Sequence, residues 1–265
     1  MELIGFSASV IMGLSLGLIG GGGSILTVPI LVYLFGVDPV ASTAYSLFVV
    51  GLTSLVGSVS HFKKGNVDLK TAFIFGLPAI ISVYSVRKFL VPAIPDTIMT
   101  IGSVTVTKSL FVMVLFATLM LLASISMIRK PKKKKEGEET EMKYKYLIIL
   151  AEGLLVGGIT GLVGAGGGFL IIPALVLMAG LPMKKAVGTS LLIIAMKSLI
   201  GFTGDLSGAL IIDYKFMLIF SAFAIVGIFA GSYLTKFIPN EKLKPVFGYF
   251  VLVMGFYILG KELLF

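Results

Sequence analysis

The chain has 265 residues, of which 57% are hydrophobic and 13% charged, and its mean hydropathy is +1.06. Several apolar runs reach the roughly 18 residues that a membrane-spanning helix needs, so an ordinary soluble protein is excluded. The net charge of +9 lies mostly in short loops beside apolar segments, which is the usual topological signal, so we expect no nucleic-acid partner. The absence of cysteine excludes disulfides, thiol nucleophiles and thiolate metal sites.

The first apolar stretch, residues 3–36, is interrupted by glycines. As a single helix it would be about 50 Å long, against a hydrocarbon core of about 30 Å. We therefore predict a break at Gly20–Gly23, followed by a helix over 24–36 that is too short to cross alone. The pair is a re-entrant hairpin, which is tolerated at membrane depth only where its backbone is buried in protein or lines a wet cavity.

Three full crossings are predicted after this hairpin, at about 40–61, 70–90 and 104–128. The segment 96–107 receives no predicted structure. Residues 129–145 are rich in charge and cannot bury a core, so we expect a solvated cytoplasmic linker. The predicted organisation is a first repeat at 1–128, the linker at 129–145 and a second repeat at 146–265.

The second half repeats the first at a shift of 144 residues. The identical pairs include Gly22 with Gly166, Gly23 with Gly167, Pro29 with Pro173, Ser46 with Ser190 and Ser54 with Ser198. The second half thus has a broken hairpin at 146–180 and spans at 185–204, 214–236 and 243–264. Because each half crosses an odd number of times, the halves are inverted, which also leaves most basic residues in the cytoplasm. The predicted fold class is an all-α polytopic membrane protein with two inverted-topology repeats, each a glycine-broken re-entrant hairpin plus three transmembrane helices.

The glycine breaks are the candidate functional site. Helices starting at Ser24 and Gly168 would aim their N-termini at one point near the midplane, where unpaired N–H groups and the helix dipole favour an anion. The alternative for the glycines is tight packing, and for the nearby hydroxyls it is bonding to carbonyls one turn back. The predicted substrate-binding residues are Gly21, Gly22, Gly23, Ser24, Ser46, Gly166, Gly167, Gly168, Thr189, Ser190 and Lys197.

Lys197 is the most informative single residue, because it falls near the middle of a predicted span. A lysine at that depth costs about 2.5–3.5 kcal/mol, so it needs a partner. The partner is either a transported anion or Glu152, and either side chain could carry a coupled proton; the alternative is a purely structural Lys197–Glu152 pair. Arg87 and Lys88, near the outer end of another span, are predicted to be interfacial anchors, with the lining of an entry vestibule as the alternative.

Enzyme chemistry has little support in this sequence. With one histidine and no cysteine the chain lacks the usual metal and thiol sites, and its acidic residues show no paired spacing on a helix face. The glycine runs lack the lysine of a phosphate-binding P-loop. We therefore predict no catalytic residue, no metal and no cofactor.

Several segments together resemble one known family. They are the duplicated glycine run with its following proline, AVGTSL at 186–191, SLIGF at 198–202, SHFKKGNVD at 60–68 and IIDY at 211–214. In combination they resemble the sulfite exporter TauE/SafE family, also called the toluenesulfonate uptake permease family. Members are described as transporters of small sulfur-containing anions such as sulfite, sulfoacetate and other organosulfonates.

The resemblance implies a multi-pass protein of the cell (inner or plasma) membrane. Its expected function is that of a secondary transporter, and specifically an exporter, that works by alternating access. The expected partners are a small anionic substrate and the lipid bilayer, with a homo-oligomer left open. Two other functions also remain open: an anion channel with the same site, and a membrane scaffold subunit in which the glycines only pack.

Overall fold

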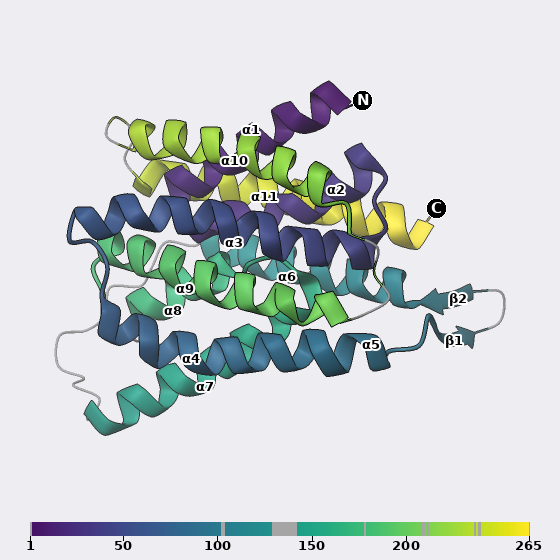
Figure 1. Ribbon diagram of the computed structural model, residues 1–265, viewed down its shortest axis with the longest axis horizontal. Coiled ribbons are helices and arrows are strands. Elements are labelled where there is room, and N and C mark those ends of the chain that lie inside the picture. Colours follow the sequence, from purple (N-terminus) through teal and green to yellow (C-terminus); the bar gives the residue numbers. More distant parts are fainter. Residues whose placement is uncertain are drawn as a thin grey trace.

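The computed structural model describes residues 2–101, 104–128, 142–177, 179–207, 210, 212–235, 237 and 240–264, and this part of the chain is almost entirely helical (Figure 1). Six of the described helices are long and apolar enough to cross a membrane, which confirms the all-α polytopic fold. They are α3 (Pro39–Lys63), α4 with its continuation to Ala93 (Leu69–Ser85), α6 (Lys108–Ile128), α9 (Met183–Thr203), α10 (Tyr214–Leu234) and α11 (Asn240–Leu264).

The first broken hairpin consists of α1 (Glu2–Ile19), a 3₁₀ helix (Gly21–Leu26) and α2 (Thr27–Phe35). The chain reverses at Gly20, whose φ of 76° is one that L-residues rarely adopt. The short arm folds back along the long one, since a Cβ at Gly5 would touch the ring of Phe35. The predicted break is therefore present, but the second arm starts as a 3₁₀ helix at Gly21 rather than as an α-helix at Ser24.

The second broken hairpin has the same plan. Its long arm α7 (Met142–Val163) begins inside the range predicted for the linker, and the rest of that linker, 129–141, lies outside the described residues. Three glycines of the turn have positive φ: Gly164 (68°), Gly166 (63°) and Gly167 (72°). The short arm α8 (Gly168–Leu177) starts at the residue predicted for it. With ten residues it is too short to span a bilayer.

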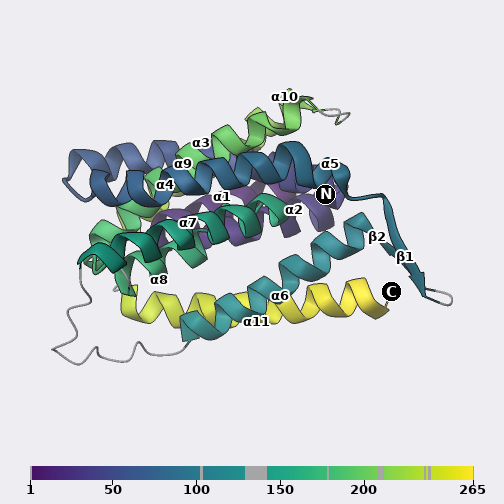
Figure 2. The ribbon, with the colours of Figure 1, turned by 90° about the horizontal axis from the view of Figure 1, so that it is seen from below.

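The helices pack in four principal pairs: α1 with α10, α4 with α7, α3 with α9 and α6 with α11. In the α3–α9 pair, Gly51 lies against Leu199 and Gly57 against Leu191, so these two helices run antiparallel. In the α6–α11 pair, visible in Figure 2, Gly248 lies against Met127 and Gly255 against Leu121, so this pair is antiparallel as well. The α3–α9 and α6–α11 pairs join repeat counterparts, whereas α1–α10 and α4–α7 are equivalent pairs that each join a hairpin to a helix of the other repeat. The inverted orientation of the repeats in a bilayer stays a prediction. Inversion requires counterpart helices to run in opposite directions, as these two antiparallel pairs do.

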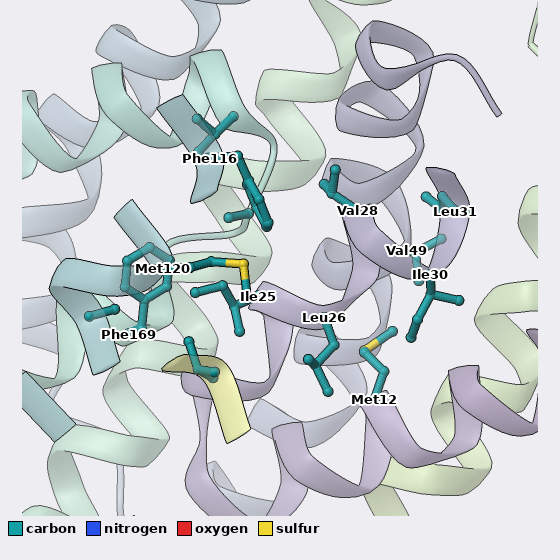
Figure 3. Packing of buried hydrophobic residues seen from close by; sticks show 14 of the residues in the cluster. Met12, Ile25, Leu26, Val28, Ile30, Leu31, Val49, Phe116, Met120 and Phe169 are labelled. Carbon is teal, nitrogen blue, oxygen red and sulfur yellow. The ribbon is translucent and has the colours of Figure 1, made fainter. Parts of the chain in front are cut away.

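The broken hairpins are covered by a hydrophobic core. Side chains of the first hairpin pack with others from α3, α6 and α8 (Figure 3). The labelled members are Met12, Ile25, Leu26, Val28, Ile30, Leu31, Val49, Phe116, Met120 and Phe169, and the 3₁₀ helix Gly21–Leu26 is buried along its whole length. The interrupted backbone is thus surrounded by protein, which is the condition for tolerating it at membrane depth.

The segment left without predicted structure is a β-hairpin. After α4, the chain continues through a π-helical turn (Val86–Leu90) and α5 (Val91–Ala93) into strands β1 (Thr97–Ile101) and β2 (Val104–Thr107), which pair antiparallel. The hairpin projects beyond the helices (Figures 1 and 2). Its Thr, Val and Ile residues have high strand propensity, which accounts for the two strands.

Candidate functional site

The two glycine turns meet at the centre of the helical bundle. A Cβ at Gly21 would lie 2.3 Å from the Cα of Gly168, and a Cβ at Gly168 would lie 2.0 Å from the Cα of Gly21. Only glycine fits at either position. The Ser24 hydroxyl lies 2.7 Å from the carbonyl oxygen of Gly21 and 2.5 Å from that of Ala165, so its proton can bond within its own turn or across to the other. The N-terminal ends of the two short arms are therefore in contact.

Several backbone N–H groups of the two turns are unpaired. Within the described part of the chain, the amides of Gly21, Gly22, Gly166, Gly167 and Gly168 have no hydrogen-bond acceptor, although all five residues are buried. Buried amides are almost always paired, because an unpaired one costs about as much as a lost hydrogen bond. Five such groups around one contact make the region electropositive.

Lys197 brings a buried amino group to this region. Its side chain is completely buried, its Nζ donates to Thr160 Oγ1 at 2.5 Å, and a Cβ at Gly167 would lie 3.3 Å from the same nitrogen. Among the described residues, no carboxylate lies within ion-pair distance of Lys197; the predicted structural pair with Glu152 is absent, and Glu152 Oε2 is itself buried without a partner. The lysine amino group thus has no carboxylate partner in the part of the protein that the structure describes.

The predicted hydroxyl residues divide into two groups. The Ser46 hydroxyl donates to Gly164 O at 2.6 Å, so it lies at the second glycine turn. Thr189 instead accepts the amide of Asp68 at 2.9 Å, at the start of α4, and is not brought to the turns. The Ser190 hydroxyl donates to Val187 O, one turn back in its own helix, although Val187 itself contacts Gly20.

Gly22 and Gly23 contact other parts of the protein than the second turn. Gly22 borders a small apolar cavity of about 20 Å³ together with Met127 and Phe169, while Gly23 packs against the backbone of Leu16. In this conformation, the contact between the two turns leaves no room for a ligand between them. The described residues include no cluster of three or more His, Asp or Glu side chains that could hold a metal.

A buried ion pair that the sequence did not predict lies near the second turn. Arg87 is almost fully buried, and it binds Asp205 through Nη2–Oδ1 at 2.6 Å and Nε–Oδ2 at 2.8 Å. Its Nη1 also donates to Thr43 Oγ1 at 2.8 Å and to Gly161 O at 3.3 Å. The predicted role of Arg87 as an interfacial anchor is therefore wrong; Lys88 does lie on the surface, where it donates to the hydroxyl of Tyr84.

The environment of Asp205 reflects two opposing effects. Burial raises the pKa of its carboxyl group, and the adjacent Arg87 guanidinium opposes that rise. Asp205 belongs to a short 3₁₀ helix (Asp205–Ser207) that directly follows α9.

An arginine inside an apolar run was the available signal for a buried pair, because such a residue needs a partner.

Comparison with known proteins identifies the family. The profile of the sulfite exporter TauE/SafE family matches residues 5–258. The chain belongs to this family. A protein of Xylella fastidiosa strain 9a5c, named a probable membrane transporter protein, is 28% identical over 256 residues, covering 95% of this chain and 92% of the relative. YunE of Bacillus subtilis strain 168, also named a probable membrane transporter protein, is 30% identical over 218 residues, covering 74% of this chain and 76% of the relative.

A third relative carries the same description. The protein MJ0441 of Methanocaldococcus jannaschii, named a probable membrane transporter protein, is 30% identical over 209 residues, covering 75% of this chain and 71% of the relative. No solved structure gives a significant match. The chain is thus a multi-pass membrane transporter of the TauE/SafE family, as the sequence segments predicted.

Proposed function

We propose that this TauE/SafE transporter is a secondary exporter of small sulfur-containing anions, such as sulfite or short organosulfonates. The observation that carries the proposal is the buried amino group of Lys197, which has no carboxylate partner among the described residues, next to the unpaired amides of the glycine turns. A buried cation without a carboxylate is costly, and a bound oxyanion would supply both the missing charge and the missing acceptors. The same donors would repel a cation.

The proposed binding residues are those at the turns, together with Ser190 and Lys197 of α9. They are Gly21, Gly22, Gly23, Ser24, Ser46, Gly166, Gly167, Gly168, Ser190 and Lys197. Thr189 is left out, because its hydroxyl is bonded to the Asp68 amide. Glu152 and Lys197 remain the proposed groups for proton coupling, since each is ionisable and lies in an apolar segment without an ion-pair partner among the described residues.

The mechanism follows from the contact between the turns. Because Gly21 and Gly168 touch, an anion enters the site only when the turns separate. Each hairpin packs mainly against a helix of the other repeat, α1 on α10 and α7 on α4. We therefore expect each hairpin to move together with the helix that it packs on, opening first one side of the site and then the other. This is alternating access in which each moving unit combines a hairpin of one repeat with a helix of the other repeat.

Flux into proteoliposomes tests the proposal. Purified protein is reconstituted, and uptake of labelled sulfite is measured with and without sulfite inside the vesicles. An alternating-access transporter shows saturable uptake that internal sulfite accelerates, whereas a channel shows no such acceleration. Lys197→Gln should abolish uptake, and the matched control Lys88→Gln, which removes a surface lysine, should leave it unchanged.

Two results would contradict the proposal. Unchanged uptake in Lys197→Gln would remove the lysine from the site. No saturable uptake of sulfite, sulfate or methanesulfonate by the wild-type protein would leave the scaffold function instead.

A further inference from the structure

Two buried hydroxyls of the central helix pair have no hydrogen-bond partner. Ser54 on α3 and Ser198 on α9 are both 0% exposed, and the structure gives neither Oγ an acceptor or donor. Serines in helices ordinarily donate to a carbonyl one turn back. Ser58 and Ser190, on the same two helices, do so at 2.8 Å. The unpaired state of Ser54 and Ser198 is therefore an exception that needs a cause, because a buried unpaired hydroxyl is destabilising.

The two serines are repeat counterparts, and they lie along the antiparallel seam between α3 and α9. Ser54 is three residues from both Gly51 and Gly57, which contact Leu199 and Leu191 of α9. Ser198 directly precedes Leu199. The same exception is thus present twice, once in each repeat, at corresponding places on one interface.

Each serine lies one helical turn beyond a residue that packs on a glycine turn. A Cβ at Gly166 would lie 2.6 Å from Val50 Cγ1, and Ser54 follows Val50 by four residues. A Cβ at Gly21 would lie 2.4 Å from Ile194 Cδ1, and Ser198 follows Ile194 by four residues. Residues four apart share a helix face. The two hydroxyls therefore lie one helical turn along from the two turns, on the helix faces that pack against them.

The unpaired hydroxyls also lie at the level of the unpaired charge. Lys197 immediately precedes Ser198, and its ammonium group has no carboxylate partner among the described residues. The two unpaired hydroxyls and the Lys197 amino group can all donate to negatively charged acceptor oxygens. A small oxyanion with several oxygens on one sulfur atom would provide them together.

We propose that Ser54 and Ser198 are hydroxyl donors of the oxyanion site, reached by the ligand when the glycine turns separate and Val50 and Ile194 move with them. The proposal rests on the transport function argued above and extends its site along the α3–α9 seam. The ligand class is a sulfite or sulfonate group, whose oxygens accept from both hydroxyls while Lys197 balances the charge.

Calorimetric titration of purified protein with sodium sulfite tests this assignment in Ser54→Ala, Ser198→Ala and the double variant. The chain has no cysteine, so it holds no disulfide that sulfite could cleave. Loss of one hydrogen bond to a charged ligand should raise the Kd about ten- to a hundredfold in each single variant. The matched control Ser58→Ala, whose hydroxyl is already bonded to Leu55 O, should bind as the wild type does.

The melting temperature without ligand separates binding from structural effects. Since neither hydroxyl makes a bond in the structure, both alanine variants should melt at the wild-type temperature. Wild-type sulfite affinity in the two variants, with Lys197→Gln still impaired, would overturn this inference and leave the transport function standing. A lowered melting temperature with unchanged affinity would also overturn it, because the serines would then hold a buried water.

The remaining outcomes are also decisive. If an alanine variant does not fold, the cysteine variant at the same position keeps the size of the side chain but replaces the hydroxyl by a weak donor. Wild-type affinity in that variant would contradict the assignment. No binding of sulfite, sulfate or methanesulfonate by the wild-type protein would overturn the transport proposal itself.

Discussion

Arg87 and Asp205 form a two-contact ion pair in which both side chains are buried and the partners are 118 residues apart in the chain. The pair links the π-helical turn after α4 to the 3₁₀ helix after α9. Through Thr43 and Gly161 it also reaches α3 and α7. Thr43 in turn packs on Gly164, so the pair is connected to the second glycine turn by direct contacts.

Removing one partner of this pair should be strongly destabilising. Asp205→Asn leaves the Arg87 charge buried and unpaired, which typically costs about 3–5 kcal/mol of unfolding free energy. Replacing both partners, as in Arg87→Met with Asp205→Asn, removes the charge and should recover much of that loss. Unfolding in detergent, followed by circular dichroism, measures both. Lys88→Met, a surface control, should change stability by less than about 0.5 kcal/mol; an Asp205→Asn variant as stable as this control would contradict the buried pair.

The contact between Gly21 and Gly168 predicts a second effect. In Gly168→Ala the added methyl group meets the Gly21 backbone, so the turns must move apart. We expect a loss of about 1–3 kcal/mol in stability and a large loss of sulfite uptake. Gly260→Ala is the matched control, because a Cβ at that helical position meets nothing within 4 Å, and it should be neutral or slightly stabilising. Equal behaviour of the two alanine variants in melting and uptake assays would show that the turns do not touch.

The hairpins and spans could be predicted because their causes are local. An apolar stretch of 34 residues with four consecutive glycines cannot form one spanning helix, and repetition of the pattern from Gly164 to Gly168 supports the same break twice. The first short helix was predicted to begin at Ser24, but a 3₁₀ helix already begins at Gly21. Four consecutive glycines give little information on the residue at which a helix begins.

The side-chain partners could not be predicted, because tertiary packing determines them. Arg87 and Lys88 are adjacent and look alike in sequence, yet one is buried and the other lies on the surface, since the partner Asp205 comes from the other half of the chain. The same holds for Thr189. Its neighbours Val187 and Ser190 belong to the helix face that meets the first turn, whereas its own hydroxyl meets the start of α4.

Thr189 provides the last prediction, which separates structural from binding hydroxyls. Its Oγ1 accepts the amide of Asp68, the residue whose own side chain accepts the Thr71 amide and begins α4. Thr189→Val keeps the shape and removes the acceptor, leaving the Asp68 amide unpaired. We expect a loss of about 1–3 kcal/mol in stability, measured by unfolding in detergent.

The sulfite affinity of Thr189→Val should equal that of the wild type, because the hydroxyl is directed to the α4 terminus and not to the glycine turns. Ser46→Ala serves as the comparison, since it removes a hydroxyl that bonds directly to Gly164 in the second turn. It should lower the sulfite affinity measured by calorimetry. Weaker binding in Thr189→Val than in Ser46→Ala would return Thr189 to the site and would require α9 to turn when the anion binds.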